Sequence, residues 1–151
     1  MATFRFQFEA VLRHRRDQER REQMAVAELE ARRHDLEATI RQHQGGIVSA
    51  RGDLRDRLAP GVTVDLRSVR MQASASLHLV GLAQRAVLEL AGVHERLDRA
   101  RRVLLRASVR RKAVELLKER KHHEWQQEQN RREDRALDEL AVMRAAAEDL
   151  T

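Results

Sequence analysis

The sequence has no cysteine, no tyrosine, a single proline and few aromatic residues of any kind. Without cysteine there is no disulfide framework, no thiolate metal site and no cysteine nucleophile. Aromatic residues make up 3% of the 151 residues, and alanine supplies 21 of the apolar ones, so a globular core of ordinary size is hard to assemble. A composition rich in Ala, Glu, Arg and Leu instead predicts long helices or a coiled coil.

Long apolar runs and catalytic motifs are missing as well. No run approaches the roughly 18 apolar residues that span a bilayer, and the N-terminus lacks the apolar stretch of a secretory signal. There is no glycine-rich phosphate loop and no serine or cysteine nucleophile beside a base. Glu119 and His123 have the spacing of two metal ligands, but no third ligand converges on them. We expect a soluble intracellular protein that is not an enzyme.

Apolar residues recur three or four positions apart along most of the chain, which is the spacing of one face of a helix. The first such seam consists of Phe8, Leu12, Val26, Leu29, Leu36, Ile40, Ile47, Leu54 and Leu58. The second consists of Leu66, Val69, Ala73, Leu77, Val80, Val87, Leu90, Leu97, Leu104, Ala107, Val114 and Leu117. It becomes mostly polar over 121–132 and returns at Leu137, Leu140 and Met143. This pattern predicts a long, imperfect coiled coil.

The segment between the two seams, 59–65, holds the single proline with a glycine directly after it. Pro60 stops the first helix, Gly61 permits a left-handed turn, and Asp65 is a suitable N-cap for the second helix. A short loop makes consecutive helices antiparallel. We therefore predict an all-α fold over 1–151, a single coiled-coil domain built as a long two-helix antiparallel hairpin. The helices cover about 8–58 and about 66–147, with the turn at 59–65.

The two predicted helices differ in length. At 1.5 Å per residue the first is about 75 Å long and the second about 120 Å. Folding at residue 61 or 62 places Leu12 near residue 112. From about Lys121 onward the second helix therefore overhangs without an internal partner. Helices draw most of their stability from packing. The overhanging end therefore either frays in solvent or packs its apolar residues against another protein.

Charge is distributed unevenly along the chain. The net charge is +6, with 27 arginine and three lysine residues against 24 acidic ones. Residues 101–121 hold nine basic and two acidic residues, a net charge of +7, whereas 124–151 hold eight acidic and four basic residues, a net charge of −4. The basic block is a solvated face, a surface for an acidic protein, or a surface for nucleic acid. A protein that merely coats nucleic acid has little reason for the reversal of sign.

Two further features leave alternatives open. Five glycines lie inside the predicted helices, where each costs about 1 kcal/mol relative to Ala. They permit close helix approach, make the tip easier to bend, or are tolerated defects. Phe4 and Phe6 alternate like a short extended segment before the first helix. They either cap the end of the coiled coil or dock on a partner.

The segment from Arg111 to Arg144 resembles the ending of flagellar FliJ proteins. The match is carried by Lys112, Glu115, Leu117, Glu119, Glu133, Leu137, Asp138, Glu139 and Ala141. The opening, FRFQFEAVLRHRRDQE, is similar to the start of that family through Phe4, Phe6, Phe8, Glu9, Val11, Leu12 and Arg15. Gly61 sits where the family places its turn glycine. The chain departs from the family at the tip, where members often carry tyrosine.

The resemblance implies a non-enzymatic component of the flagellar type III export apparatus. Such proteins are antiparallel coiled coils similar to the central stalk of rotary ATP synthases. Their paired termini and overhanging helix enter the hexameric ring of the flagellar export ATPase and promote its assembly and ATP hydrolysis. Their body contacts the cytoplasmic domain of the export-gate protein FlhA and the export chaperones. A cytoplasmic location, peripheral at the inner face of the cell membrane, follows, with no cofactor, metal or nucleic acid.

The same resemblance implies where the contacts lie. The ATPase-binding residues are Arg110, Arg111, Lys112, Glu115, Leu117, Glu119, Glu133, Leu137, Asp138 and Glu139. The export-gate-binding residues lie near the tip and are Ile40, His43, Ile47 and Met71. Two alternatives remain: the stalk protein of a virulence type III secretion system, which shares the architecture, and a basic coiled-coil protein associated with nucleic acid.

Overall fold

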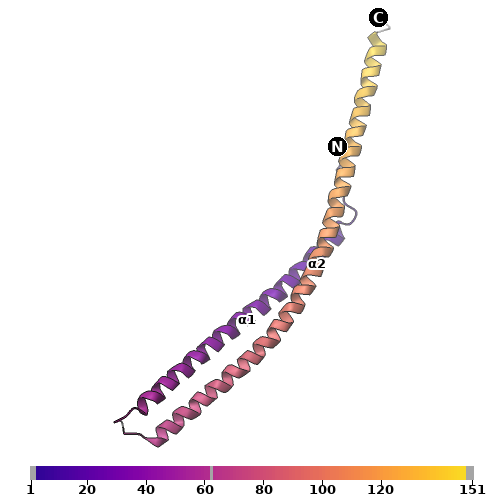
Figure 1. The fold of residues 1–151 in the computed structure, drawn as a ribbon. Coiled ribbons are helices and arrows are strands. Elements are labelled where there is room, and N and C mark those ends of the chain that lie inside the picture. The colour runs from indigo at the N-terminus through magenta and orange to yellow at the C-terminus, as the bar shows by residue number, and fades with distance from the viewer. Residues whose placement is uncertain (1–2, 62, 149–151) are drawn as a thin grey trace. The chain divides into compact units, whose positions relative to one another are not determined.

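The computed structural model describes residues 3–61 and 63–148, with side chains up to Arg144, as two helices, α1 (Glu9–Arg57) and α2 (Leu66–Glu148) (Figure 1). No strand occurs among these residues. The predicted all-α hairpin is confirmed, and the helix ends lie within one residue of the predicted ones. Contacts between residues divide the chain into unit 1 (Met1–Arg20 with Leu105–Thr151) and unit 2 (Arg21–Leu104). That the chain is a single domain stays a prediction.

The turn between the helices is built as its residues predict. Gly61 has a φ of 88°, a left-handed conformation that costs glycine little. The Asp65 carboxylate accepts a hydrogen bond from the Arg67 backbone N–H at 3.0 Å, which is the contact of an N-cap. At the end of α1 the Leu58 N–H donates to the Leu54 carbonyl at 3.1 Å. Leu58 itself is exposed, although the first seam predicts it at the interface.

Unit 2 contains the turn and the helix segments on either side of it. Its buried side chains, each at most 7% exposed, are Leu36, Ala86, Val93 and Leu97. Polar pairs join the two helices along their edges, between Arg32 and Glu89, Arg101 and Glu30, and Gln72 and Asp53. Partners early in α1 lie late in α2, which is the antiparallel order that the short turn imposes.

The predicted second seam is wrong near the turn. It assigns Leu66, Leu77 and Val87 to the interface with α1, yet their exposed fractions are 78%, 72% and 50%. Leu79 faces α1 instead, and its Cδ1 lies 3.3 Å from the place that a Cβ on Gly46 would take. This stretch of α2 carries large apolar residues on both sides, so periodicity alone does not select the inner face.

Unit 1 pairs the first turns of α1 with α2. Leu12 is fully buried there and Ala107 nearly so. The first seam also predicts Phe8 at this interface, but Phe8 is 43% exposed and packs its ring edge-on against Phe6 at 5.9 Å between centroids. Ion pairs on either side of Leu12 place it about one turn further along α2 than residue 112.

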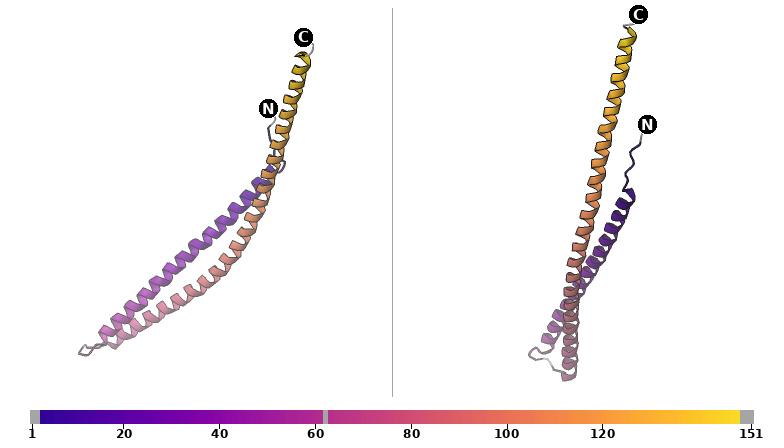
Figure 2. Two further views of the ribbon diagram at one scale, coloured as in Figure 1. Left: turned by 45° about the horizontal axis from the view of Figure 1, so that its top comes forward. Right: turned by 90° about the vertical axis from the view of Figure 1, so that its right-hand side faces the viewer.

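Within unit 1, α2 continues as a single helix beyond the start of α1 (Figure 2). Every residue from Asn130 to Arg144 is exposed. The sequence predicts the overhang from about Lys121, but Phe4 contacts α2 as far as Trp125. The extended segment before α1 thus covers about one more turn of α2 than helix lengths alone indicate.

Candidate functional site

Carboxylates of α1 hold the paired part of unit 1 together. The Lys118 ammonium donates to Glu9 Oε2 at 2.7 Å, and Ser108 Oγ donates to Glu19 Oε1 at 2.5 Å. Arg111 Nε also donates to the Glu19 carboxylate. These contacts recur along one side of α1, so they fix the register of the two helices as well as their pairing.

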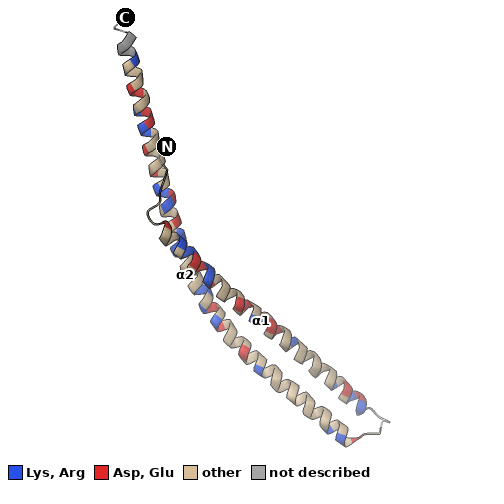
Figure 3. Ribbon diagram, turned by 180° about the vertical axis from the view of Figure 1, so that it is seen from behind, with Lys and Arg blue, Asp and Glu red and all other residues tan. Residues whose placement is uncertain are grey.

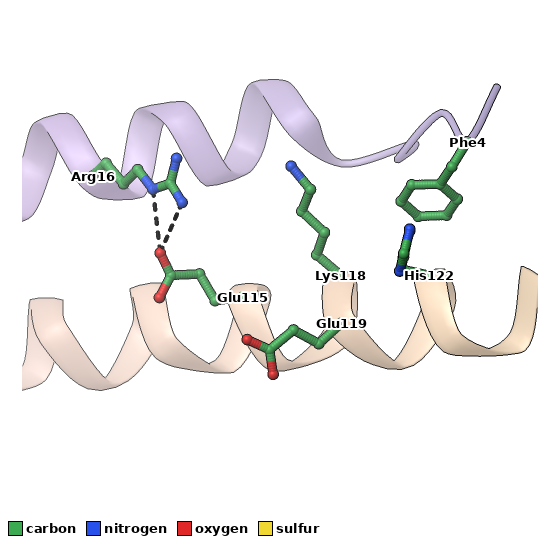
Figure 4. Close-up of a pocket in the computed structure, with 6 residues that line it drawn as sticks. All are labelled: Phe4, Arg16, Glu115, Lys118, Glu119 and His122. Carbon is green, nitrogen blue, oxygen red and sulfur yellow. Dashed lines mark hydrogen bonds and ion pairs between the residues drawn. The ribbon is translucent and has the colours of Figure 1, made fainter. Parts of the chain in front are cut away.

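A second set of ion pairs centres on Glu115 of α2. Arg16 donates to Glu115 Oε1 through Nε at 3.2 Å and through Nη2 at 3.0 Å (Figure 4). Arg111 donates to the other oxygen of the same carboxylate. Arg111 therefore bridges a carboxylate of each helix, and Glu115 receives a guanidinium from each helix.

The ionisation of these groups is coupled to the pairing. The hydrogen bond from Ser108, followed by the one from Arg111, lowers the pKa of Glu19 below its ordinary 4.5. The hydrogen bond from Lys118 likewise lowers the pKa of Glu9. Contact with the Glu19 carboxylate raises the pKa of Arg111 above its ordinary value. Each shift favours the charged form, so unit 1 keeps its ion pairs at neutral pH.

Aromatic side chains close the end of this paired region. The Phe4 ring meets the His122 ring edge-on at 5.0 Å and lies 5.9 Å from the Trp125 ring. Lys118 Nζ lies 5.9 Å from the centroid of the Phe6 ring, within range of a cation–π contact. These contacts favour the interpretation that the N-terminal phenylalanines cap the coiled coil.

An open depression of about 480 Å³ lies beside this aromatic end (Figure 4). It is lined by Phe4, Arg16, Glu115, Lys118, Glu119 and His122. Its walls pair acid with base and include no serine or cysteine nucleophile. No group of three metal-ligating side chains occurs among the described residues, and Glu119 and His123 gain no third ligand there. The side chains that line the depression therefore offer charged and aromatic surface.

The structure separates the predicted ATPase-binding residues of the basic block into two groups. Arg111 and Glu115 form ion pairs inside unit 1, and Leu117 is half-buried. Arg110, Lys112 and Glu119 are exposed. Only the second group is presented to solvent, whereas the first group positions the two helices.

The other predicted ATPase-binding residues lie on the overhang of α2. Glu133, Leu137, Asp138 and Glu139 are all exposed, on a stretch where no other described segment covers the helix. Four large apolar side chains of this stretch are exposed to solvent, namely Leu137, Leu140, Val142 and Met143. An exposed apolar set on an uncovered, charged helix is typical of a surface that binds another protein.

The predicted gate-binding residues lie in unit 2, where an apolar groove of about 530 Å³ runs between the helices. The groove is lined by Ile40, Gln44, Ile47, Val80, Ala83, Gln84, Val87 and Leu88. Two of the four predicted residues, Ile40 and Ile47, therefore share one surface. His43 is half-buried and Met71 is exposed, but neither lines the groove.

Reasoning from the sequence missed the side chains that α1 and its leading segment bring to α2. Glu9 and Glu19 are ion-paired to α2, and Phe4 contacts Trp125. The ten-residue spacing of Glu9 and Glu19 puts both on one side of a helix, opposite the basic block, and this signal was available. The sequence also offered Phe4 and Phe6 as a cap of the coiled coil, but which residues of α2 they contact depends on the register of the hairpin to within one turn.

Two long paired helices with exposed charged and apolar surfaces define a helical hairpin. Residues 4–149 match the model of the family described as flagellar FliJ protein. The chain therefore belongs to this family of flagellar export components, which is not a known family of enzymes. No curated protein and no solved structure matches the chain. Neither helix contains, in its described residues, a stretch long and apolar enough to cross a membrane.

Proposed function

We propose that this chain binds and activates the hexameric flagellar export ATPase in the manner of a rotary stalk, through the overhang and the adjoining basic block. The observation that carries the proposal is the run from Asn130 to Arg144, a single helix exposed at every residue. A helix without packing is marginal in water, and burial of Leu137, Leu140 and Met143 by another protein would stabilise it.

The charges of unit 1 support contact with a protein that presents both signs. Arg110 and Lys112 are exposed on the basic block, while Glu133, Asp138 and Glu139 are exposed on the overhang. The two groups lie on the same helix, more than about 30 Å apart at 1.5 Å per residue from Lys112 to Glu133. A partner that contacts both groups must therefore extend along α2. The wall of the central opening in a ring of subunits has such an extent.

A truncation tests the overhang. The chain should end after Gln129, because a cut before Trp125 would also remove the contact of that residue with Phe4. Hydrolysis of ATP by the flagellar export ATPase is measured with the full chain, with the truncated chain and alone. We expect stimulation by the full chain and loss of most of it on truncation. A truncated chain that stimulates fully would remove the overhang from the mechanism.

Charge reversal tests the basic block. Arg110→Glu with Lys112→Glu reverses two exposed cations and leaves the internal ion pairs of Arg111 intact. Arg51→Glu with Arg55→Glu makes the same change on exposed residues of α1 in unit 2. We expect the first pair to weaken ATPase binding by tenfold or more, on the order of 1.4 kcal/mol, and the second to leave it unchanged. Equal affinities would exclude the block from the interface.

The groove of unit 2 supports a second contact, with the cytoplasmic domain of the export-gate protein FlhA or with export chaperones. Ile40 and Ile47 line this groove, and the exposed Met71 lies on α2 of the same unit. Association with these partners would hold the chain at the inner face of the membrane. Ile47→Asp, at a side chain that lines the groove, should weaken binding to the FlhA domain in a titration, whereas Val48→Asp, at an exposed apolar side chain outside the groove, is the matched control. Unchanged binding by both variants would contradict this assignment.

A further inference from the structure

One side of α2 in unit 2 lies opposite the buried residues of this helix and carries an unusual order of side chains. Its residues, called here the outer face, recur three or four positions apart and therefore share one side of the helix. They are Arg70, Ala73, Leu77, Gly81, Gln84, Leu88, Ala91 and Glu95. The buried side of the same segment holds Ala86, Val93 and Leu97, about half a turn away from the outer face.

The outer face exposes apolar surface that no described residue covers. Leu77 is 72% exposed and Leu88 is 74% exposed. A Cβ on Gly81 would meet no atom within 4 Å, so this glycine is not needed for packing against α1. The two exposed leucines lie on either side of Gly81, which leaves a hollow between them. A second helix can pack its side chains into such a hollow.

Charge is missing from the middle of this face. Residues 71–84 contain no Asp, Glu, Lys or Arg, in a chain where these make up 36% of the residues. Figure 3 shows this part of α2 as a continuous uncharged stretch following the turn. The charges begin at its two ends, with Arg70 before it and Arg85, Glu89 and Glu95 after it.

The outer face is complementary to itself when its order is reversed. Arg70 at one end corresponds to the oppositely charged Glu95 at the other, Leu77 corresponds to Leu88, and Gly81 corresponds to Gln84. These three pairs share one centre on the helix, midway between Gly81 and Gln84. We propose that the outer face binds the outer face of a second copy of this chain, antiparallel, about a two-fold axis at that point.

Such a dimer satisfies each group of the face. Arg70 of each copy lies opposite Glu95 of the other, and Leu77 of each copy packs against Leu88 of the other. Gly81 lets the backbones approach, and Gln84 of the second copy lies over it. The Glu95 carboxylate already accepts from Arg99 of its own helix, but that pair is exposed and weak enough for Arg70 to join it. The contact extends about 38 Å along α2.

Other arrangements use the face less well. A parallel dimer brings Arg70 near Arg70 and Glu95 near Glu95, and like charges oppose association. Leu88 and Gln84 also line the groove between α1 and α2, so the dimer covers one edge of that groove.

Sedimentation of the full chain from about 1 to about 200 μM tests the proposal, since a reversible dimer depends on concentration. We expect a monomer–dimer equilibrium in which Leu77→Asp and Leu88→Asp each raise the dissociation constant at least tenfold. Leu105→Asp, at an exposed leucine of unit 1, is the matched control and should leave it unchanged. Circular dichroism checks that each variant keeps its helices. A monomer at every concentration, or a dimer indifferent to both outer-face variants, would overturn the proposal.

Charge swaps and cross-linking test the antiparallel register. Arg70→Glu alone and Glu95→Arg alone should each weaken the dimer, and the double variant should restore it. Failure of the double variant to recover would contradict the pairing. Because the chain has no cysteine, Gln84→Cys introduces a single thiol beside the axis and should form a disulfide-linked dimer on oxidation. Arg106→Cys, exposed in unit 1, should not, and equal cross-linking at both positions would refute the register.

Discussion

The paired part of unit 1 and the part of unit 2 near the turn are both made of two helices, but they are held together differently. In unit 1 the carboxylates of Glu9, Glu19 and Glu115 link α1 to α2. In unit 2 residues 71–84 contain no charged side chain, and apart from the hydrogen bond of Gln72 to Asp53 the contact with α1 there is apolar. Charge thus fixes the register at one end, while the other end leaves apolar surface exposed for partners.

The largest effect on stability should come from substitutions in the small apolar core, because each of the two units contains a buried leucine. Leu97 in unit 2 and Leu12 in unit 1 are at most 1% exposed. Replacing either by alanine should lower the free energy of unfolding by about 2–4 kcal/mol, measured by urea titration with circular dichroism. Leu105→Ala, at an exposed position, should change it by less than about 0.5 kcal/mol. Equal losses at Leu97 and Leu105 would show that the inner face is misassigned.

The start of α2 gives the next largest effect. Asp65 caps this helix through its bond to the Arg67 N–H, and Asp65→Ala leaves that donor unsatisfied. We expect a loss of about 1 kcal/mol in unfolding free energy, with Asp65→Asn close to the original chain. Asp56→Ala, at an exposed carboxylate in the last turn of α1, provides the control, and a loss there as large as at Asp65 would rule out capping as the cause.

The helix glycines of unit 2 and the turn glycine Gly61 should respond to alanine in opposite directions. A Cβ on Gly45 or Gly52 meets nothing within 4 Å, so Gly→Ala at either should raise the melting temperature, with a gain of about 0.5–1 kcal/mol. Gly46→Ala should gain less, because Leu79 Cδ1 lies 3.3 Å from the new Cβ. Gly61→Ala should be destabilising, since φ there is 88°. A loss at Gly45 and Gly52 would mean that close approach requires them.

The smallest effect is a pH dependence that belongs to unit 1. Glu19 and Glu9 have pKa values below 4.5 because they accept hydrogen bonds from Ser108 with Arg111 and from Lys118. Below 4.5 the unfolded chain binds protons that the folded chain does not, so the stabilisation present above 4.5 is lost as the pH falls through the folded values. The urea concentration at the midpoint of unfolding should be lower at pH 3.5 than at pH 6. The decrease should be smaller in Glu19→Gln than in the original chain. A Glu19→Gln chain with the full pH dependence would contradict the assignment.

Much of the fold follows from local chemistry in the sequence. The order of Pro60, Gly61 and Asp65 ends one helix and begins the next, and the unequal lengths on either side of that turn predict the overhang. These features depend on backbone geometry and residue counts alone. The structure agrees with the predicted helix ends to within one residue.

The inner face of α2 and the contacts of the N-terminal segment were beyond such reasoning. Leu77 and Leu79 are equally apolar and two residues apart, and only contact with Gly46 selects Leu79. Arg111 lies in the basic block and is predicted to bind a partner. In the structure it forms an ion pair with Glu19, and this pair depends on which residues of α1 lie opposite Arg111. Both outcomes are set by interhelical register, which periodicity within one helix does not contain.

Hydrogen exchange across residues 130–144 tests the central claim most directly, because it reads the uncovered stretch of α2 with and without a partner. The account predicts fast exchange there in the chain alone and slow exchange in complex with the flagellar export ATPase, while residues 86–97 around the core of unit 2 exchange alike in both. Fast exchange in both states, or slow exchange in the chain alone, would contradict it.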